Sequence, residues 1–565
     1  MSGLRAKFLF PPLLGVMAWA QGVPLPEVAS RTLGNGVKVL LLERPGAGAV
    51  QARVFLRGGR ANTGGLPPAA ADLLARTLFT RLLPEALDQS LSGPLQAEDG
   101  AFAALRLDRL HTLRAGTGLP SSEFPDLKAL HAKALATLVE KLGALEVWDG
   151  LDALGATHRD LTVTADFLSH GADLPVKAFL PWCQWEAGRL KHLPLARFPL
   201  ERDRLLREIE GGTPPSSPSL SVLLATALSG HPYAQAADFQ RSGVEAISLE
   251  DLQGYGEWMV RPEHLTLVLV GDVKLAAVLP ALERSFGTLG KGVPRSHWNP
   301  MIAYQSEDPM GSLESPGGRH LLVSTTGDTR LYFAWRMPPV NHPDGPALQV
   351  LAQIMGGAPS SRLRQNLTGP RGVARRLTLK LGVPGEREAN LLVVEAEPES
   401  GRSMEELELA VQGEALRLQR EVLPEQEVRT AQTQLEADQI LLQEDAAILA
   451  QTLGAAQCQG GDWRLAFRAL ELGRTFKPAE IQSVARTYLT PARVTVALLA
   501  PDPLLLSMDR TEGRLLQVLT ALVQLKLKDP AQVQVVLREA LRQMRMLSSG
   551  EREKTLKLLE AQVRP

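Results

Sequence analysis

Residues 248–270 decide the fold, and they read SLEDLQGYGEWMVRPEHLTLVLV. A helical pattern begins at Ser248 and ends at Val260. Pro262 then breaks the helix, because proline lacks the backbone N–H that the helix needs. The apolar run from Leu265 to Val270 follows at once and is typical of a buried strand. The stretch therefore predicts a helix, a proline break and a strand in direct succession.

The same succession occurs a second time, displaced by 229 residues (477 − 248) and without a gap. Residues 477–499 read KPAEIQSVARTYLTPARVTVALL, with a helix, Pro491 and a strand. The two halves also begin alike, each with a strand, Gly/Pro-rich turns and a helix, at 54–79 and 330–355. A repeated unit of roughly 200 residues indicates duplication of an α+β lobe, in contrast to a solenoid of short repeats.

Breaks in pattern divide the chain into segments. We expect a first lobe over 21–288 that contains an inserted helical hairpin at about 84–146, where two helical stretches flank Gly116, Gly118 and Pro120. A Pro/Gly-rich linker follows over 289–325, then a second lobe over 326–505 and a helical tail over 506–565.

Composition excludes several classes of protein. The chain has 61 basic and 62 acidic side chains, a net charge of −1, and no long run of one sign. That balance gives no electrostatic footprint for nucleic acid and no basic stripe for a membrane surface. The 44% of hydrophobic residues is ordinary for a globular protein.

Residues 1–20 have the layout of a secretory signal peptide. Arg5 and Lys7 precede an apolar stretch, and Ala18-Trp19-Ala20 forms a small-x-small cleavage site. An uncleaved amphipathic start is the alternative. No later segment is apolar over about 18 consecutive residues, so we expect no integral membrane segment after cleavage and a periplasmic or extracellular location.

The chain has two cysteines, Cys183 and Cys458, one in each half. Export would permit a disulfide between them. Lone cysteines in separate lobes are more often free and buried, and we expect that state here. No Cys/His spacing indicates a structural metal.

Several motifs resemble the insulinase–pitrilysin zinc peptidases, in order and over roughly residues 30–505. They include the turn Asn35-Gly36, the segment 198–208, Gly230-His-Pro-Tyr233, and 356–363 with Arg371-Gly372 in the second half. The resemblance implies an α+β fold of two homologous α/β-sandwich lobes. Each lobe would have an antiparallel or mixed sheet with helices on one face, and the pair would form half of a clamshell. Bacterial members of this kind also carry a helical insertion, which fits 84–146.

The family's chemistry requires His-x-x-Glu-His on one helix, where both histidines bind zinc and the glutamate acts as general base. The matching residues here are Asp72-Leu-Leu-Ala75-Arg76. Arg76 stays protonated and would oppose a cation at this place, and Ala75 cannot accept a proton. The resemblance implies a zinc cofactor, and these replacements predict its loss.

The third zinc ligand of the family would be Glu208, seven residues after Glu201. We hypothesise that the guanidinium of Arg76 takes the place of the metal and pairs with Glu208, with Asp72 one helical turn away. The alternative is that Glu201 and Glu208 are surface carboxylates.

The second lobe of active relatives supplies an Arg and a Tyr that orient the substrate. Those places hold Thr368 and Arg375 here. No catalytic residue of the family is therefore expected to be intact.

The resemblance leads to three hypotheses of function. The first is a non-catalytic partner subunit, or a substrate-capturing chain, for an active zinc endopeptidase outside the cytoplasm. Its partner would be an active homologue or a second copy, with polypeptides as substrates and no nucleic acid. The second is a metallopeptidase with a site rebuilt from Asp72, Glu201 and Glu208. The third is a stand-alone peptide-binding or scaffold protein that captures extended chains at a strand edge.

Overall fold

The computed structural model describes residues 25–78, 85–115, 123–142, 149–213, 215–290, 319–325, 329–369 and 372–501, and scattered positions beyond 501. The expected signal peptide at 1–20, most of the expected linker and most of the helical tail at 506–565 lie outside these residues. No helix in the described part of the chain is long and apolar enough to cross a membrane.

The first half builds a six-stranded sheet in the order β1-β2-β6-β3-β5-β4. Strand β6 pairs parallel with β2, and the other neighbours pair antiparallel. Strand β4 forms one edge of this sheet. The bounds are β1 (Val28–Thr32), β2 (Lys38–Glu43), β3 (Ala49–Arg57), β4 (Thr157–Val163), β5 (Phe167–Pro175) and β6 (Leu265–Gly271).

The second half repeats this topology in a five-stranded sheet, β7-β11-β8-β10-β9, again with one parallel pair, β7 with β11. Position by position it corresponds to β2-β6-β3-β5-β4, which confirms the duplication. The bounds are β7 (Arg319–Thr325), β8 (Arg330–Met337), β9 (Ala374–Val383), β10 (Asn390–Pro398) and β11 (Val494–Pro501). Strand β7 lies inside the stretch expected to be a linker, so that expectation was wrong for residues 319–325.

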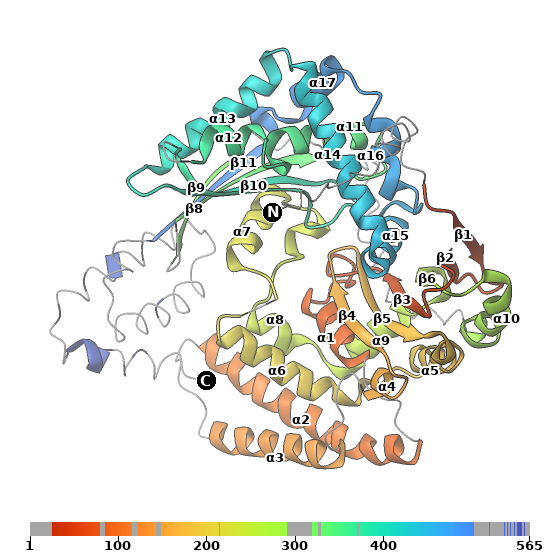
Figure 1. Cartoon of the computed structure of the whole chain (residues 1–565). Coiled ribbons are helices and arrows are strands. Elements are labelled where there is room, and N and C mark those ends of the chain that lie inside the picture. The colour runs from red at the N-terminus through yellow and green to blue at the C-terminus, as the bar shows by residue number, and fades with distance from the viewer. Residues whose placement is uncertain are drawn as a thin grey trace, which may run out of the picture.

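Helices pack on both sheets (Figure 1). The first half contains α1 (Ala69–Leu78), α2 (Glu85–Ala115), α3 (Phe124–Leu142), α4 (Asp149–Asp152), α5 (Phe179–Lys191), α6 (Phe198–Glu210), α7 (Pro218–Ala227), α8 (Arg241–Ala246), α9 (Leu249–Met259) and α10 (Leu275–Ser285). The second half contains α11 (Gly345–Ala352), α12 (Arg362–Leu367), α13 (Met404–Arg420), α14 (Glu425–Glu444), α15 (Ala446–Gly460), α16 (Leu465–Gly473) and α17 (Pro478–Tyr488). The long helices α2 and α3 form the expected inserted hairpin.

The repeated stretches fold alike for a local reason. Ser248 caps α9 by accepting a hydrogen bond from the backbone N–H of Asp251, whose carboxylate accepts one from the backbone N–H of Ser248. At the start of α17, the Glu480 carboxylate likewise accepts a hydrogen bond from the backbone N–H of Lys477, at 2.8 Å. These bonds satisfy helix-terminal N–H groups that would otherwise have no partner.

Each sheet has a second apolar face, and a helix of the other half covers it. Helix α15 packs on β3, β5 and β6, where Leu449 and Leu453 join Phe55 and Val268 in one buried cluster. Helix α7 packs in turn on β7, β8 and β11 of the second sheet. The helix that covers this second face belongs to the opposite lobe, so the two lobes interlock.

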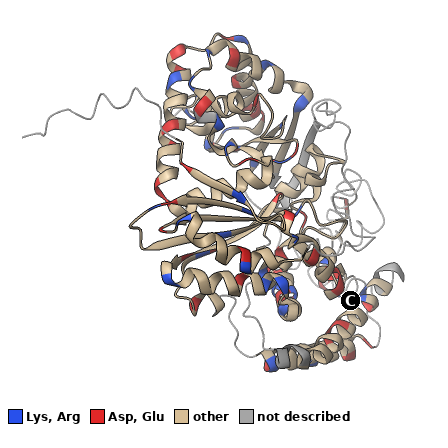
Figure 2. Cartoon of the chain, turned by 90° about the vertical axis from the view of Figure 1, so that its right-hand side faces the viewer, with Lys and Arg blue, Asp and Glu red and all other residues tan. Residues whose placement is uncertain are grey.

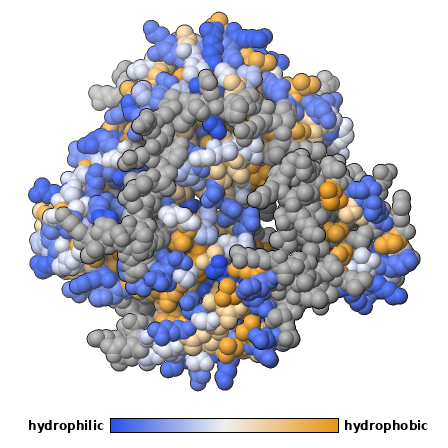
Figure 3. Space-filling model, turned by 180° about the vertical axis from the view of Figure 1, so that it is seen from behind, coloured by the Kyte–Doolittle hydropathy of each residue, from blue (hydrophilic) through white to orange (hydrophobic). Residues whose placement is uncertain are grey.

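The outer surface is mixed in character. Lys and Arg are interspersed with Asp and Glu over the side shown in Figure 2, in keeping with the net charge of −1. On the face seen in Figure 3, hydrophobic residues lie in small groups among hydrophilic ones.

Candidate functional site

Residues 72–76, which the resemblance matches to the family's zinc-binding motif, lie on α1, and α1 packs against α6 and α9 within the first lobe. Asp72 and Ala75 are buried there, at 5% and 0% exposure, and the side chain of Arg76 is 22% exposed. Gly59 brings the preceding loop close to the β4–β5 turn, because a Cβ on Gly59 would lie 2.2 Å from the carbonyl oxygen of Thr164. This close approach fixes the course of the loop between β3 and α1.

Arg76 and Glu208 form an ion pair with two hydrogen bonds. Nη1 of Arg76 donates to Oε1 at 2.9 Å and Nη2 donates to Oε2 at 2.7 Å. The pairing expected from the sequence is therefore present. Hydrogen bonds from Arg76 lower the pKa of Glu208. Burial disfavours the charge of Arg76, but the bonds from Glu208 and the charges of Asp72 and Glu201 outweigh it and raise the pKa of Arg76. Both groups are thus charged.

Asp72 has a different partner from the one its helical spacing indicated. Arg60 donates to it from Nε and from Nη2, both at 2.8 Å. The Arg60 guanidinium also lies over the Phe239 ring, 5.1 Å from its centroid. The expected cluster of Asp72 with Arg76 is therefore not a direct contact. Asp72 acts on Arg76 through its charge, which helps to raise the pKa of Arg76. Sequence reasoning missed Arg60, since a separation of 12 residues matches no helical spacing.

Glu201 is not a surface carboxylate, since it is 3% exposed. Its nearest cation is Arg197, 3.5 Å from Oε1 to Nη2. Glu208 is 29% exposed and has a second, longer contact with Arg204, 3.6 Å away on the same helix. The alternative that Glu201 and Glu208 are surface carboxylates is therefore wrong for Glu201, and it fits Glu208 only in part.

These residues do not fit a zinc ion. A zinc site needs neutral or anionic ligands around an open position. Here the guanidinium of Arg76 lies against the Glu208 carboxylate, and Asp72 already binds Arg60. Ala75 offers no proton acceptor. The described residues contain no group of three His, Cys, Asp or Glu side chains that could hold a metal.

Thr368 and Arg375 lie in the second lobe and have partners there. Thr368 ends α12, and its hydroxyl donates to the backbone carbonyl of Arg364. Arg375, on β9, donates from Nη2 to the Glu397 carboxylate at 2.9 Å. In the part of the chain that the structure describes, no ion pair or hydrogen bond joins either residue to Arg76 or Glu208.

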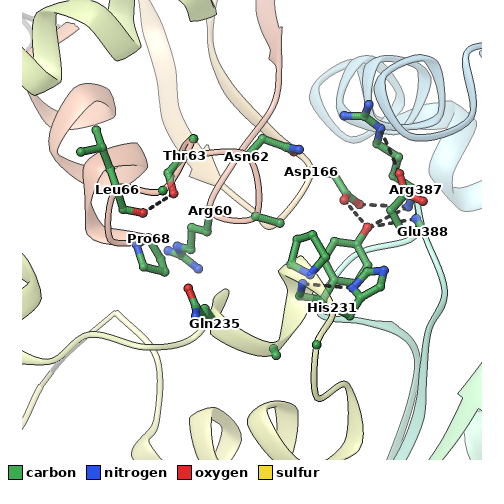
Figure 4. A pocket seen from close by; sticks show the side chains of 17 residues that line it. Arg60, Asn62, Thr63, Leu66, Pro68, Asp166, His231, Gln235, Arg387 and Glu388 are labelled. Carbon is green, nitrogen blue, oxygen red and sulfur yellow. Dashed lines mark hydrogen bonds and ion pairs between the residues drawn. The ribbon is translucent and has the colours of Figure 1, made fainter. Parts of the chain in front are cut away.

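A pocket of about 370 Å³ lies between the two lobes (Figure 4). Its walls come from the β3–α1 loop, the turn at 230–235, and residues 387–388 of the second lobe. Arg60 lines this pocket and binds Asp72, so the pocket adjoins residues 72–76. His231 caps the turn that follows it, since its Nδ1 accepts a hydrogen bond from the backbone N–H of Tyr233 at 3.1 Å. Burial lowers the pKa of His231 to about 4.

One side of the pocket is a polar clasp between the lobes, formed by Asp166, Tyr233 and the backbone of 386–388. The buried Asp166 carboxylate accepts from the backbone N–H groups of Glu386, at 2.7 Å, and Arg387, at 3.2 Å. The Tyr233 hydroxyl donates to Asp166 and accepts from the N–H groups of Arg387 and Glu388. No sequence motif identified this clasp, because its parts lie 220 residues apart.

Both cysteines are free and buried, as expected. Burial raises the pKa of each thiol to about 12. Neither thiol is therefore a nucleophile at neutral pH.

Comparison with known proteins identifies the fold. A family model of the Peptidase M16 inactive domain matches residues 246–435. That range includes the end of the first lobe and much of the second, but neither residues 72–76 nor Glu208. No curated protein matches the chain.

Solved structures match over most of the chain. A protease from Helicobacter pylori has a TM-score of 0.65 at 17% identity and covers 84% of this chain and 100% of its own. A peptidase M16 inactive domain from Pseudomonas fluorescens has a TM-score of 0.61 at 16% identity, and the match covers 84% of this chain and 98% of that domain. The first half of the periplasmic protease PqqL from Escherichia coli has a TM-score of 0.57 at 10% identity, and the match covers 92% of this chain and 98% of that half. The resemblance to the M16 peptidases and the fold class are thus confirmed.

Proposed function

Because the chain has the fold of M16-type peptidases with an arginine among the family's metal-ligand positions, we propose that it is a non-catalytic partner of an active zinc endopeptidase. It would act outside the cytoplasm, as a partner subunit or as a substrate-capturing chain. The observation that carries the proposal is the two-point ion pair of Arg76 with Glu208. A carboxylate held in this way by a cation is not available to a metal.

The size of the matched unit also supports the proposal. The chain matches almost all of the first half of PqqL but 49% of the intact protein. A two-lobed chain of this kind would leave room for a second two-lobed chain opposite it, and an active homologue with His-x-x-Glu-His would supply the chemistry.

The test is to purify the chain alone and together with a motif-bearing homologue from the same source. We expect no stoichiometric zinc and no peptidase activity from the chain alone, and stable co-purification with the homologue. Stoichiometric zinc in the isolated chain, or a chain that stays alone under all native conditions, would contradict the proposal.

Restoring the motif gives a sharper test of the site itself. The variant D72H/A75E/R76H provides two imidazoles at i,i+4 spacing and frees the Glu208 carboxylate, so we expect it to bind about one zinc per chain. Elemental analysis after dialysis measures this. The matched control is D72H/A75E, which keeps Arg76 and should stay free of zinc. Equal zinc in both variants would show that Arg76 does not block the metal.

A stand-alone peptide-binding protein is the second candidate, and the edge strand β4 favours it. Strand β4 ends the first sheet and pairs there with β5. Residues Thr157 to Arg159 are exposed, so an extended peptide could add as a further strand. Binding of unfolded peptides by the isolated chain, measured by fluorescence anisotropy, would support this role. No binding by the isolated chain, with binding by the assembled pair, would reject it.

The three carboxylates that a rebuilt metal site would use are already next to arginines. Asp72 binds Arg60, Glu208 binds Arg76, and Glu201 has Arg197 beside it. Each of the three carboxylates therefore has an arginine where a metal would have to compete.

A further inference from the structure

A groove of about 360 Å³ lies between α5 and α10, the two helices labelled at the right of Figure 1. It extends along α5 from Leu180 to Lys191, which is roughly 16 Å at 1.5 Å per residue. It is thus long enough for a segment of polypeptide. It is separate from the Arg76–Glu208 site and from the pocket between the lobes.

Small residues of both helices line the groove. They are Ala187 and Gly188 on α5, and Ala281 and Ser285 on α10. At the N-terminal end of α5, the apolar side chain of Leu180 is 53% exposed. An exposed leucine at the end of a groove lined by small residues is suited to an apolar anchor of a bound chain.

Two exposed cations, Lys191 and Arg284, line the groove. Within the described part of the chain, neither side chain makes a hydrogen bond or an ion pair. The segments 176–191 and 274–288 contain five Lys or Arg and two Asp or Glu. One of those two, Glu186, is buried and bound to Arg189. The groove therefore has a local excess of positive charge in a chain whose net charge is −1.

We propose that this groove docks an acidic, amphipathic segment of a partner protein. Carboxylates of the segment would pair with Lys191 and Arg284, and an apolar side chain would pack against Leu180. A small anion would not use the length or the apolar end of the groove. The proposal concerns the outer side of the first lobe. Its test is therefore independent of the role proposed for Arg76 and Glu208.

The test uses the full chain and a labelled helical peptide of about 16 residues, with glutamates one turn apart on one face and leucines beside them. Fluorescence anisotropy should show binding that weakens as salt is added. A peptide with glutamine in place of each glutamate should bind at least about tenfold more weakly. The variant K191E/R284E should lose a similar factor for the acidic peptide.

The matched control is K380E, which makes a single charge reversal at an exposed lysine on β9 of the second lobe and should bind like the wild type. K191Q/R284Q replaces the double reversal if thermal unfolding shows that the latter disturbs the fold. Equal binding of the glutamine peptide, or unchanged binding by both double variants, would overturn the proposal. Displacement of the peptide by millimolar inorganic phosphate would reassign the groove to small anions. Self-association that K191E/R284E abolishes in sedimentation would reassign it to a second copy of this chain.

Discussion

At the scale of single residues, the Arg76–Glu208 pair is specific in geometry but modest in energy. Its side chains are 22% and 29% exposed, so water screens the charges. Pairs of this kind contribute on the order of 1 kcal/mol or less. The two parallel hydrogen bonds fix the direction of both side chains, which matters more for excluding a metal than for stability.

A double-mutant cycle on R76M and E208Q measures this pair. We expect a coupling energy of about 0.5–1 kcal/mol by urea unfolding, because the pair is bidentate and partly buried. The control cycle is R429M with E425Q, an exposed pair on α14 whose side chains are 68% and 74% exposed. Its coupling should be about 0.3 kcal/mol. A coupling at Arg76 no larger than this control would mean that the pair forms without energetic consequence.

At the scale of elements, the packing of α15 on the first sheet depends on one glycine. A Cβ on Gly454 would lie 2.0 Å from Cε2 of the Phe55 ring. Phe55 belongs to the apolar cluster that joins the two halves, so the helix cannot move away without opening that cluster.

The variant G454A should destabilise the chain by roughly 1–3 kcal/mol, because the extra methyl group overpacks a filled core. Denaturant unfolding measures the effect. Gly413, inside α13, is the matched control, since nothing lies within 4 Å of a Cβ built on it. G413A should be neutral or stabilise the chain by up to about 1 kcal/mol through helix propensity. Equal effects at the two glycines would contradict the packing described for α15.

At the scale of the whole molecule, the two halves complete each other. Helix α15 covers the first sheet, helix α7 covers the second, and the clasp at Asp166 binds backbone groups of the second lobe. The lobes are therefore duplicated in sequence but not independent in stability.

A fragment of residues 21–290 should consequently fail to fold as a soluble monomer. It would leave the apolar face around Phe55 and Val268 without the cover of α15. Co-expression with residues 315–505 should recover soluble material, and the intact chain should show one cooperative thermal transition. A soluble 21–290 fragment with native-like near-ultraviolet circular dichroism would show that the lobes are independent.

The clasp also predicts a dependence on pH. Burial, together with the nearby Asp166 charge, raises the pKa of Glu386 from 4.5 to about 7. The unfolded chain therefore releases this proton first, and stability should fall as the pH rises from about 4.5 to about 7, then level off. The variant E386Q should lose this pH-dependent fall in stability between about pH 4.5 and pH 7. The measurement is the free energy of unfolding at a series of pH values. An unchanged slope in E386Q would contradict the raised pKa.

Much of the fold could be predicted from local pattern. The helix–proline–strand repeat located β6 and β11, and Gly116, Gly118 and Pro120 marked the break between the two helices of the α2–α3 hairpin. The Arg76–Glu208 contact was reached through the resemblance to a family, since no spacing rule joins residues 132 apart. The end of the linker was misplaced at β7, because an edge strand beside proline-rich sequence has a weak periodic signal.

Local patterns in the sequence were enough to predict the duplicated lobe and to show that residues 72–76 lack the spacing of a His-x-x-Glu-His motif. Both follow from chemistry and periodicity within a few residues of each other. Three contacts became known only from the folded chain. Asp72 binds Arg60, α7 and α15 each cover the sheet of the opposite half, and Asp166 and Tyr233 bind backbone groups of the second lobe. These contacts depend on which distant segments meet when both apolar faces of each sheet are buried, and no local pattern records that outcome.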